Sequence, residues 1–150
     1  MKKTKTIVIC SSASFYEKLF PIQNELKKLK FKVVLPKTAN TMKKQNNFNV
    51  ESVKTWYKNP NDYSKKQKLM KEHFEKIIKG DIILVANFDK NNLEGYVGGN
   101  TLMEMTIAFF YKKPIFVLND ISENLSFKEE IYGLTPRFLN GDLSKIEKYV

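Results

Sequence analysis

The chain has 150 residues, of which 42% are hydrophobic, which is enough for one packed domain with a single core. No apolar run reaches the length that spans a bilayer, so we expect neither a membrane protein nor a disordered one. The formal net charge is +10, from 26 basic and 16 acidic residues, and Arg137 is the only arginine. Because nucleic-acid readers favour arginine, this balance favours a solvated lysine coat or a small anionic substrate over nucleic-acid binding.

The number of cysteines and the first ten residues indicate in which cellular compartment we expect the protein. Cys10 is the only cysteine, so no internal disulfide can form, which is typical of the reducing cytosol. A single cysteine and a single histidine also argue against a structural zinc site. The opening "MKKTKTIVIC" has an apolar part of only four residues, "IVIC", which favours a strand over a signal peptide. We therefore expect a cytoplasmic protein.

Apolar runs and helical periodicity alternate along the chain. The pattern predicts strands over residues 5–10, 31–36, 81–87, 114–119 and 136–140. It predicts helices over residues 12–30, 64–80, 100–113 and 141–150, and a short helix or a loop over residues 123–134. Alternating strands and helices favour a parallel sheet with right-handed crossovers. We expect one α/β domain over residues 1–150, with a doubly wound five-stranded sheet in the order 2-1-3-4-5.

Two of the expected helices carry signals at their ends. In the first, Ser14 is a candidate N-cap, and Pro21 predicts either a kink or a fresh start of the helix. In the helix over 64–80, Gly80 is expected to close the last turn at the C′ position. Its apolar face is expected to consist of Leu69, Met70, Phe74, Ile77 and Ile78.

Residues 37–63 form a polar, asparagine-rich stretch with little periodicity. The stretch is too long for an ordinary connection, so we expect a functional loop or lid, with a helical turn or two within "VESVKTWY". Trp56, Tyr57 and Tyr63 in this stretch either anchor it to the body of the domain or stack on a planar base.

The expected topology places a ligand site beyond the carboxyl ends of the first and third strands, where the strand order reverses. Three segments meet there: "CSSASF", "ANFDKN" and "GGNTLME". The residues that we expect to bind substrate come from these segments, namely Cys10, Ser11, Ser12, Phe15, Asn87, Asp89, Gly98, Gly99, Asn100 and Thr101.

Each of these groups also has a structural interpretation. Ser11 and Ser12 can end a strand and cap a helix, or hold a phosphate or sugar hydroxyl at the helix start. Cys10 can be a small buried apolar residue. Gly98 and Gly99 can form a plain turn, and the polar side chains after the third strand can form Asx turns.

Glu104 is the main catalytic candidate. Thr101 and Glu104 have the spacing of a capping box, in which both side chains serve the helix start. The alternative is a carboxylate that faces a ligand, because a glycine-rich loop precedes it and an apolar helix follows. Such a carboxylate suits attack at the anomeric carbon of a sugar, whose transition state carries positive charge.

His73 is the second catalytic candidate and the only histidine. Its position relative to Ile77 predicts that it lies on the flank of its helix, beside Phe74. It is either an interfacial histidine with one polar partner, or a proton shuttle or hydrogen-bonding group at the site.

Two common phosphate-binding motifs are missing. The loop after the first strand is "CSSASF" and has no glycine fingerprint for a dinucleotide, and no Walker loop occurs. We therefore expect no cofactor.

The segment "KGDIILVANFDKNNLEGYVGGNTLMEMTIAFFYKKPIFVLN" resembles the nucleoside 2-deoxyribosyltransferase-like superfamily, which includes deoxynucleoside 5′-monophosphate N-glycosidases. The shared pattern consists of Asp81 at the start of a strand, the loop Gly99-Asn100-Thr101, Glu104 at a helix start, and "YKKPIFVLN" after Ala108. The opening "IVICSS" is also similar, although Ser11 and Ser12 replace a glycine-containing turn. "GYVGGNTLMEM" is more loosely similar to the glycine-rich motif of nucleoside-monophosphate phosphoribohydrolases.

The resemblance implies a flavodoxin-like domain that forms a homodimer or a larger homo-oligomer. It implies that Glu104 is the nucleophile that takes the sugar and releases the base, after which water or a second base resolves the intermediate. It places His73 where the hydrolase branch has an acid that contacts the ligand. The substrate would be a nucleoside or its monophosphate. The alternative is a nucleotide-binding or sensing module on the same fold, without turnover.

Overall fold

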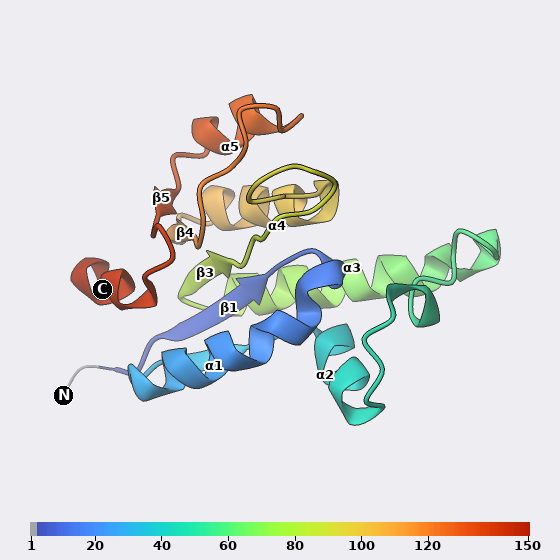
Figure 1. Cartoon of the computed structure of the whole chain (residues 1–150). Helices are drawn as coiled ribbons and strands as arrows, with labels where there is room; N and C mark the ends of the chain where they lie inside the picture. Colours follow the sequence, from blue (N-terminus) through green and yellow to red (C-terminus); the bar gives the residue numbers. More distant parts are fainter. Residues whose placement is uncertain (1–2) are drawn as a thin grey trace.

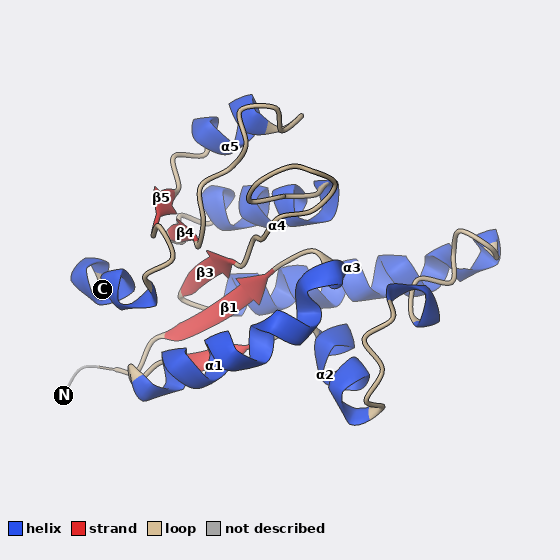
Figure 2. Ribbon diagram, viewed as in Figure 1, coloured by secondary structure: helices blue, strands red, loops and turns tan. Residues whose placement is uncertain are grey.

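A computed structural model describes residues 3–150 of the chain. It contains a five-stranded, all-parallel sheet in the order β2-β1-β3-β4-β5 (Figures 1 and 2). The strands are β1 (Thr6–Cys10), β2 (Lys32–Val34), β3 (Ile82–Val85), β4 (Ile115–Val117) and β5 (Arg137–Phe138). The predicted doubly wound α/β fold, with its strand order, is confirmed and is consistent with a flavodoxin-like domain.

The helices lie on both faces of this sheet (Figure 1). The α-helices are α1 (Leu19–Lys28), α2 (Lys37–Lys44), α3 (Tyr63–Lys79), α4 (Gly99–Phe110) and α5 (Lys128–Gly133). The 3₁₀ helices are η1 (Ala13–Lys18), η2 (Val50–Ser52), η3 (Pro60–Asp62) and η4 (Leu143–Tyr149). None of the helices in residues 3–150 is long and apolar enough to cross a membrane.

Alternating side chains of the central strands build two cores. Ile7 and Ile9 of β1 point to the face that α1, α2 and η4 cover, whereas Val8 and Cys10 point to the face that α3, α4 and α5 cover. All four side chains are fully buried. Burial on both faces explains why the central strands are continuous apolar runs and lack the alternation of a half-exposed sheet.

The first helical region differs from the expected single helix. Ser12 precedes η1, so Ser14 lies inside the 3₁₀ helix and caps nothing. The α-helix starts afresh at Leu19, and Pro21 occupies its first turn. Proline is tolerated there because the N–H groups of a first turn have no partner within the helix.

The prediction of a loop throughout residues 37–63 is wrong for its first third. Lys37–Lys44 forms α2, whose only buried side chains are Ala39 and Met42. Two apolar positions give too weak a period to be recognised in the sequence. We call residues 45–62 the lid segment; it runs from α2 to the outer end of α3, which extends beyond the sheet (Figure 1).

Gly80 ends α3 as predicted, but for a different reason. Its φ of −76° is open to any residue, so no left-handed cap is formed. A Cβ atom at this position would lie 2.6 Å from Cγ2 of Val8. Glycine is therefore required because the chain end of α3 passes directly against β1.

Candidate functional site

A cavity of about 340 Å³ opens beyond the carboxyl ends of β1 and β3. These two strands are neighbours at the point where the sheet order reverses, so the site lies where the topology predicts it. Its walls come from the loop after β1, the start of α2, the lid segment, α3, the loop after β3 and the start of α4.

Most of the predicted site residues meet at this cavity. The lining includes Ser11, Ser12, His73, Gly98, Gly99, Asn100, Thr101 and Glu104. Four predicted residues are not in the lining, namely Cys10, Phe15, Asn87 and Asp89. Cys10 is fully buried directly behind the wall, where it touches both His73 and Glu104.

Three of the residues predicted to bind substrate have partners within the protein. Ser11 lines the cavity, but its hydroxyl donates to the carbonyl of Ala86 at 2.6 Å and so joins the ends of β1 and β3. Phe15 packs edge to face on Phe88, with 5.4 Å between ring centroids. Asp89 accepts a hydrogen bond from the backbone N–H of Gly95 at 3.2 Å.

Asn87 forms a clamp between the ends of β3 and β4. Its Nδ2 donates to the carbonyls of Gly95, at 3.0 Å, and Asn119, at 2.8 Å. Its Oδ1 accepts from the N–H of Asn119 at 2.9 Å, and Nδ2 of Asn119 donates back to the Asn87 carbonyl at 2.7 Å. The amide is therefore fully engaged in holding the loop, and no group of it is free for a ligand.

Glu104 does not cap its own helix. The N-cap of α4 is Gly98, which has no side chain, and Thr101 lies inside the first turn, so the capping-box arrangement is not formed. The carboxyl group instead lies at the cavity, only 4% exposed, beside Cys10 and His73. The spacing of Thr101 and Glu104 therefore reflects the site and does not reflect helix capping.

Burial determines the charge of Glu104. Desolvation raises the pKa of its carboxyl group to about 8, while a hydrogen bond from the Cys10 thiol and the positive charge of Lys66 act in the opposite direction. The pKa of Cys10 is raised in turn by burial, by the charge of Glu104 and by the same hydrogen bond. The thiol therefore stays protonated at neutral pH, as a donor and not a nucleophile.

His73 lies in the middle of the buried face of α3, so the predicted flank position is wrong. It is 6% exposed, and with Ile77 it forms the buried centre of that helix. Its Nε2 lies 3.1 Å from the carbonyl of Ile9, which can only accept, so Nε2 carries the proton. Burial, followed by the charge of Lys76, lowers the pKa of His73 to about 4, so the ring is neutral at neutral pH.

Cys10, His73 and Glu104 together form a group of metal-ligating types. Their ligand atoms lie within 4.8 Å of one another. Nε2 of His73, the nitrogen that faces the group, lies 3.7 Å from Sγ of Cys10 and 3.7 Å from Oε2 of Glu104. Because this nitrogen donates its proton to Ile9, it has no lone pair for a cation, and a metal would have to displace that hydrogen bond.

One side of the cavity is cationic, which no motif in the sequence predicted. Its lining includes the lysines Lys37, Lys54, Lys66, Lys76 and Lys90. Aromatic rings lie among them: Tyr16, Tyr96, Trp56 and Tyr57, of which the last two were considered as stacking groups. The unusual length of the lid segment could have suggested that its residues reach the site. The sequence could not show that they meet residues of α3 there.

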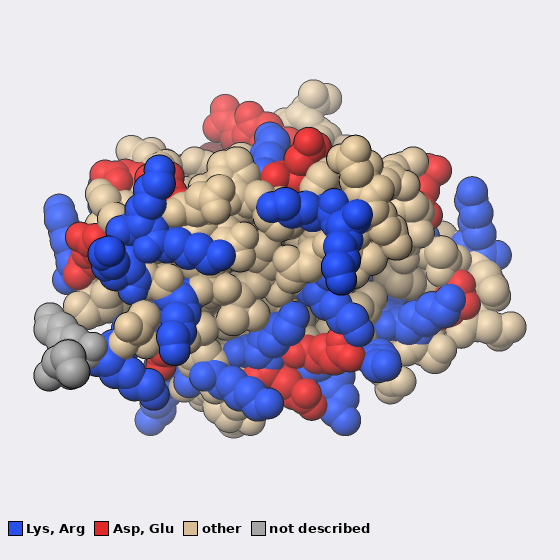
Figure 3. Space-filling view, turned by 90° about the horizontal axis from the view of Figure 1, so that it is seen from below, with Lys and Arg blue, Asp and Glu red and all other residues tan. Residues whose placement is uncertain are grey.

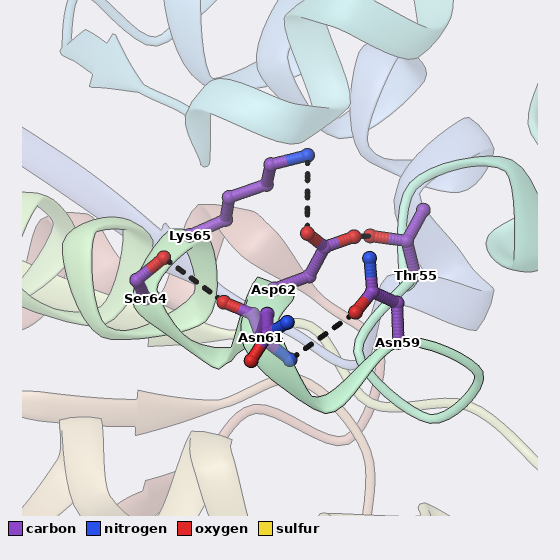
Figure 4. A network of polar contacts seen from close by, with 6 residues as sticks. All are labelled: Thr55, Asn59, Asn61, Asp62, Ser64 and Lys65. Atoms are coloured by element: carbon purple, nitrogen blue, oxygen red, sulfur yellow. Dashed lines mark hydrogen bonds and ion pairs between the residues drawn. The ribbon is translucent and has the colours of Figure 1, made fainter.

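A small polar network anchors the lid segment to the start of α3 (Figure 4). Oγ1 of Thr55 donates to Oδ2 of Asp62 at 2.6 Å, and Lys65 lies 3.5 Å from the other carboxylate oxygen. Asn59 accepts from the N–H of Asn61 at 3.3 Å, at the start of η3. Since Thr55 lies between Lys54 and Trp56, its bond holds both cavity residues in place.

Comparison with known proteins does not assign the chain to a family. Neither a scan against models of protein families nor a search of curated proteins found a match to this chain.

Proposed function

We propose that the protein cleaves or transfers the N-glycosidic bond of nucleosides or their phosphates, with Glu104 as the nucleophile. The observation that supports this most strongly is a carboxyl group at a cavity with no capping or ion-pair role in its own fold. The resemblance to the nucleoside 2-deoxyribosyltransferase-like superfamily points to the same residue.

The proposed reaction has two steps. A carboxylate oxygen of Glu104 forms a bond to the anomeric carbon, and the electron pair of the C–N bond leaves with the base, which takes up a proton from water. A water molecule or a second base then attacks the same carbon, releases the carboxylate, and gives up a proton to the hydroxide that the first step left. A hydrolysis consumes one water molecule and yields free sugar and base, whereas a transfer exchanges one base for another.

The surroundings of Glu104 suit this chemistry. At pH 7 a carboxyl group with a pKa of about 8 is ionised in roughly one molecule in ten, and its burial makes that carboxylate a poorly solvated nucleophile. The positive charge of Lys66 favours the ionised form. The developing positive charge on the sugar favours it further, since opposite charges attract strongly in a buried site.

Neighbouring groups have supporting roles in this proposal. His73 is neutral and is bonded to Ile9, so it positions Cys10 and Glu104 and does not supply the proton. The rings of Trp56, Tyr57 and Tyr96 offer planar surfaces for a base. Asn100 lines the cavity, and its buried Oδ1 has no hydrogen-bond partner among residues 3–150.

The test is to incubate the protein with deoxynucleosides, ribonucleosides and their phosphates, and to follow the release of free base by chromatography. Glu25→Gln, an exposed position on α1, is a matched control for Glu104→Gln because it makes the same change of a carboxyl group to an amide outside the cavity. The proposal expects base from at least one member of the panel. Absence of base from all of them would overturn it.

A binding or sensing module is the second candidate. It is favoured by the raised pKa of Glu104, because most molecules carry a neutral carboxyl group at neutral pH. Calorimetry followed by recovery of the ligand separates the two: a module binds the nucleotide and returns it intact.

Homo-oligomer formation, which the resemblance implies, remains a prediction that light scattering in solution can test.

A further inference from the structure

Three lysines from separate segments of the chain converge on the cavity. Lys54 belongs to the lid segment, Lys66 to α3 and Lys90 to the loop after β3, and all three line the cavity and are half-buried. Half-buried lysine side chains without acidic partners are uncommon, since an ammonium group is strongly hydrated. We call these residues the lysine triad.

Two of the three ammonium groups lie over aromatic rings. Nζ of Lys66 lies 5.2 Å from the ring centre of Trp56, and Nζ of Lys90 lies 5.0 Å from that of Tyr96. Both rings line the same cavity. Burial lowers the pKa of Lys54, and the charges of Lys66 and Lys90 lower it further, so the three charges act on one another.

The cavity does not neutralise this charge. It has two glutamates, Glu72 and Glu104. Glu72 pairs with Lys37 at 3.7 Å, and Glu104 is largely protonated at neutral pH. Among the ion pairs of residues 3–150, none includes a member of the lysine triad.

The lysine triad also differs from the lysines on the outer surface. On the face shown in Figure 3, lysine and arginine side chains are spread over the surface with acidic side chains among them. Such groups are solvated, and their mutual repulsion is screened by salt. The lysine triad instead concentrates positive charge beside aromatic rings in a partly enclosed site, where an anion would be bound more strongly.

We propose that the lysine triad binds a chain of at least two phosphates, so that the ligand of this cavity is a nucleoside diphosphate or a longer phosphate ester. The choice rests on charge: one phosphate monoester carries about −1.5 to −2 at pH 7, whereas a diphosphate chain carries about −3, which matches three ammonium groups. Lysine binds phosphate as a point charge and needs no bidentate geometry. The assignment of the chain to a nucleotide rests on the proposed function, but binding of the phosphates does not.

Titration calorimetry at pH 7 and fixed ionic strength tests this with inorganic pyrophosphate and inorganic phosphate as probes. We expect pyrophosphate to bind at least about tenfold more tightly, and Lys54→Gln, Lys66→Gln and Lys90→Gln each to weaken it by about tenfold. Lys54→Arg should retain binding, since it keeps the charge. Lys28→Gln, an exposed position at the end of α1, has the same change in net charge and should have no effect.

Two results would overturn the proposal: equal affinity for phosphate and pyrophosphate, or equal binding by the triad variants and Lys28→Gln. Thermal unfolding of each variant checks that it is folded. The experiment is independent of turnover, so tight pyrophosphate binding without base release from any nucleotide would contradict the proposed function and support the lysine triad. Base release with no preference for pyrophosphate over phosphate would support the proposed function and contradict phosphate-chain binding by the lysine triad.

Discussion

Oε2 of Glu104 lies 3.7 Å from Nε2 of His73, yet the two groups do not form an ion pair at neutral pH. Burial raises the pKa of Glu104 to about 8 and lowers the pKa of His73 to about 4, so both are mainly uncharged between these values. A buried pair of this kind avoids the cost of desolvating two charges. It also leaves the carboxyl group ready to respond to a charged ligand.

Glu104→Gln should stabilise the protein at alkaline pH. The pKa of Glu104 is about 8 in the folded protein and 4.5 as its ordinary value, so the folded state holds the proton more tightly and wild-type stability falls as pH rises between them. Glutamine does not titrate. Urea unfolding should show the variant to be more stable by a few kcal/mol at pH 9 and by much less at pH 5. An equal difference at both pH values would contradict the buried-acid interpretation.

His73→Gln should reduce the sensitivity to acid. The pKa of His73 is about 4 in the folded protein against an ordinary 6.5, so the unfolded chain binds the extra proton and stability falls as pH drops through this window. This loss amounts to about 3 kcal/mol by pH 4. The glutamine amide can still donate to the Ile9 carbonyl. Chemical unfolding at pH 7 and pH 4.5 should show a smaller acid loss for the variant; an unchanged loss would show that other groups cause it.

Thr55→Val should loosen the lid segment. It removes the 2.6 Å hydrogen bond to Asp62 while keeping the shape of the side chain. Hydrogen exchange in residues 54–62 should become faster, and pyrophosphate affinity should fall several-fold because Lys54 is no longer held in place. Ser52→Ala is the control, since that hydroxyl bonds only to the carbonyl of Asn49 on an exposed turn. Equal hydrogen-exchange rates in residues 54–62 for the two variants would contradict a role of the Thr55–Asp62 hydrogen bond in holding the lid segment.

Two glycines should respond in opposite ways to alanine. Gly95 has a φ of +57°, and an added Cβ would clash with the carbonyl oxygen of Asp120 and lie 2.8 Å from Nδ2 of Asn87. Gly95→Ala should cost about 3 kcal/mol or more of stability. Gly133→Ala, in α5 with open space around it, should be neutral or stabilising by up to about 1 kcal/mol. Similar melting temperatures for the two variants would show that the Asn87 clamp does not depend on a close backbone approach.

The sheet was predictable because its central strands are buried on both faces. Continuous apolar runs such as Ile7–Cys10 and Ile82–Val85 leave little choice of element, and alternation with helices leaves little choice of order. α2 was missed because it buries only Ala39 and Met42, and most of its surface is polar. Local pattern is informative only where a segment packs a wide apolar face.

The site was predictable in part, by topology. The rule for parallel sheets brought Ser11, Ser12 and the start of α4 to one place. The sequence could not show whether Glu104 serves the helix or the cavity, because that depends on the helix having Gly98 and not Thr101 as its N-cap. Nor could it show that Lys54, Lys66 and Lys90 converge, because they come from separate segments and only the folded lid brings them together.

The initial rate of base release by wild-type protein, Glu104→Gln and Glu25→Gln, with a nucleotide that the wild type accepts, tests the central claim most directly. A carboxylate that forms the bond to the anomeric carbon cannot be replaced by an amide, so we expect a rate loss of about a thousandfold or more for Glu104→Gln. Glu25→Gln should match the wild type. If Glu104→Gln releases base as fast as the wild type while remaining folded, Glu104 is not the nucleophile.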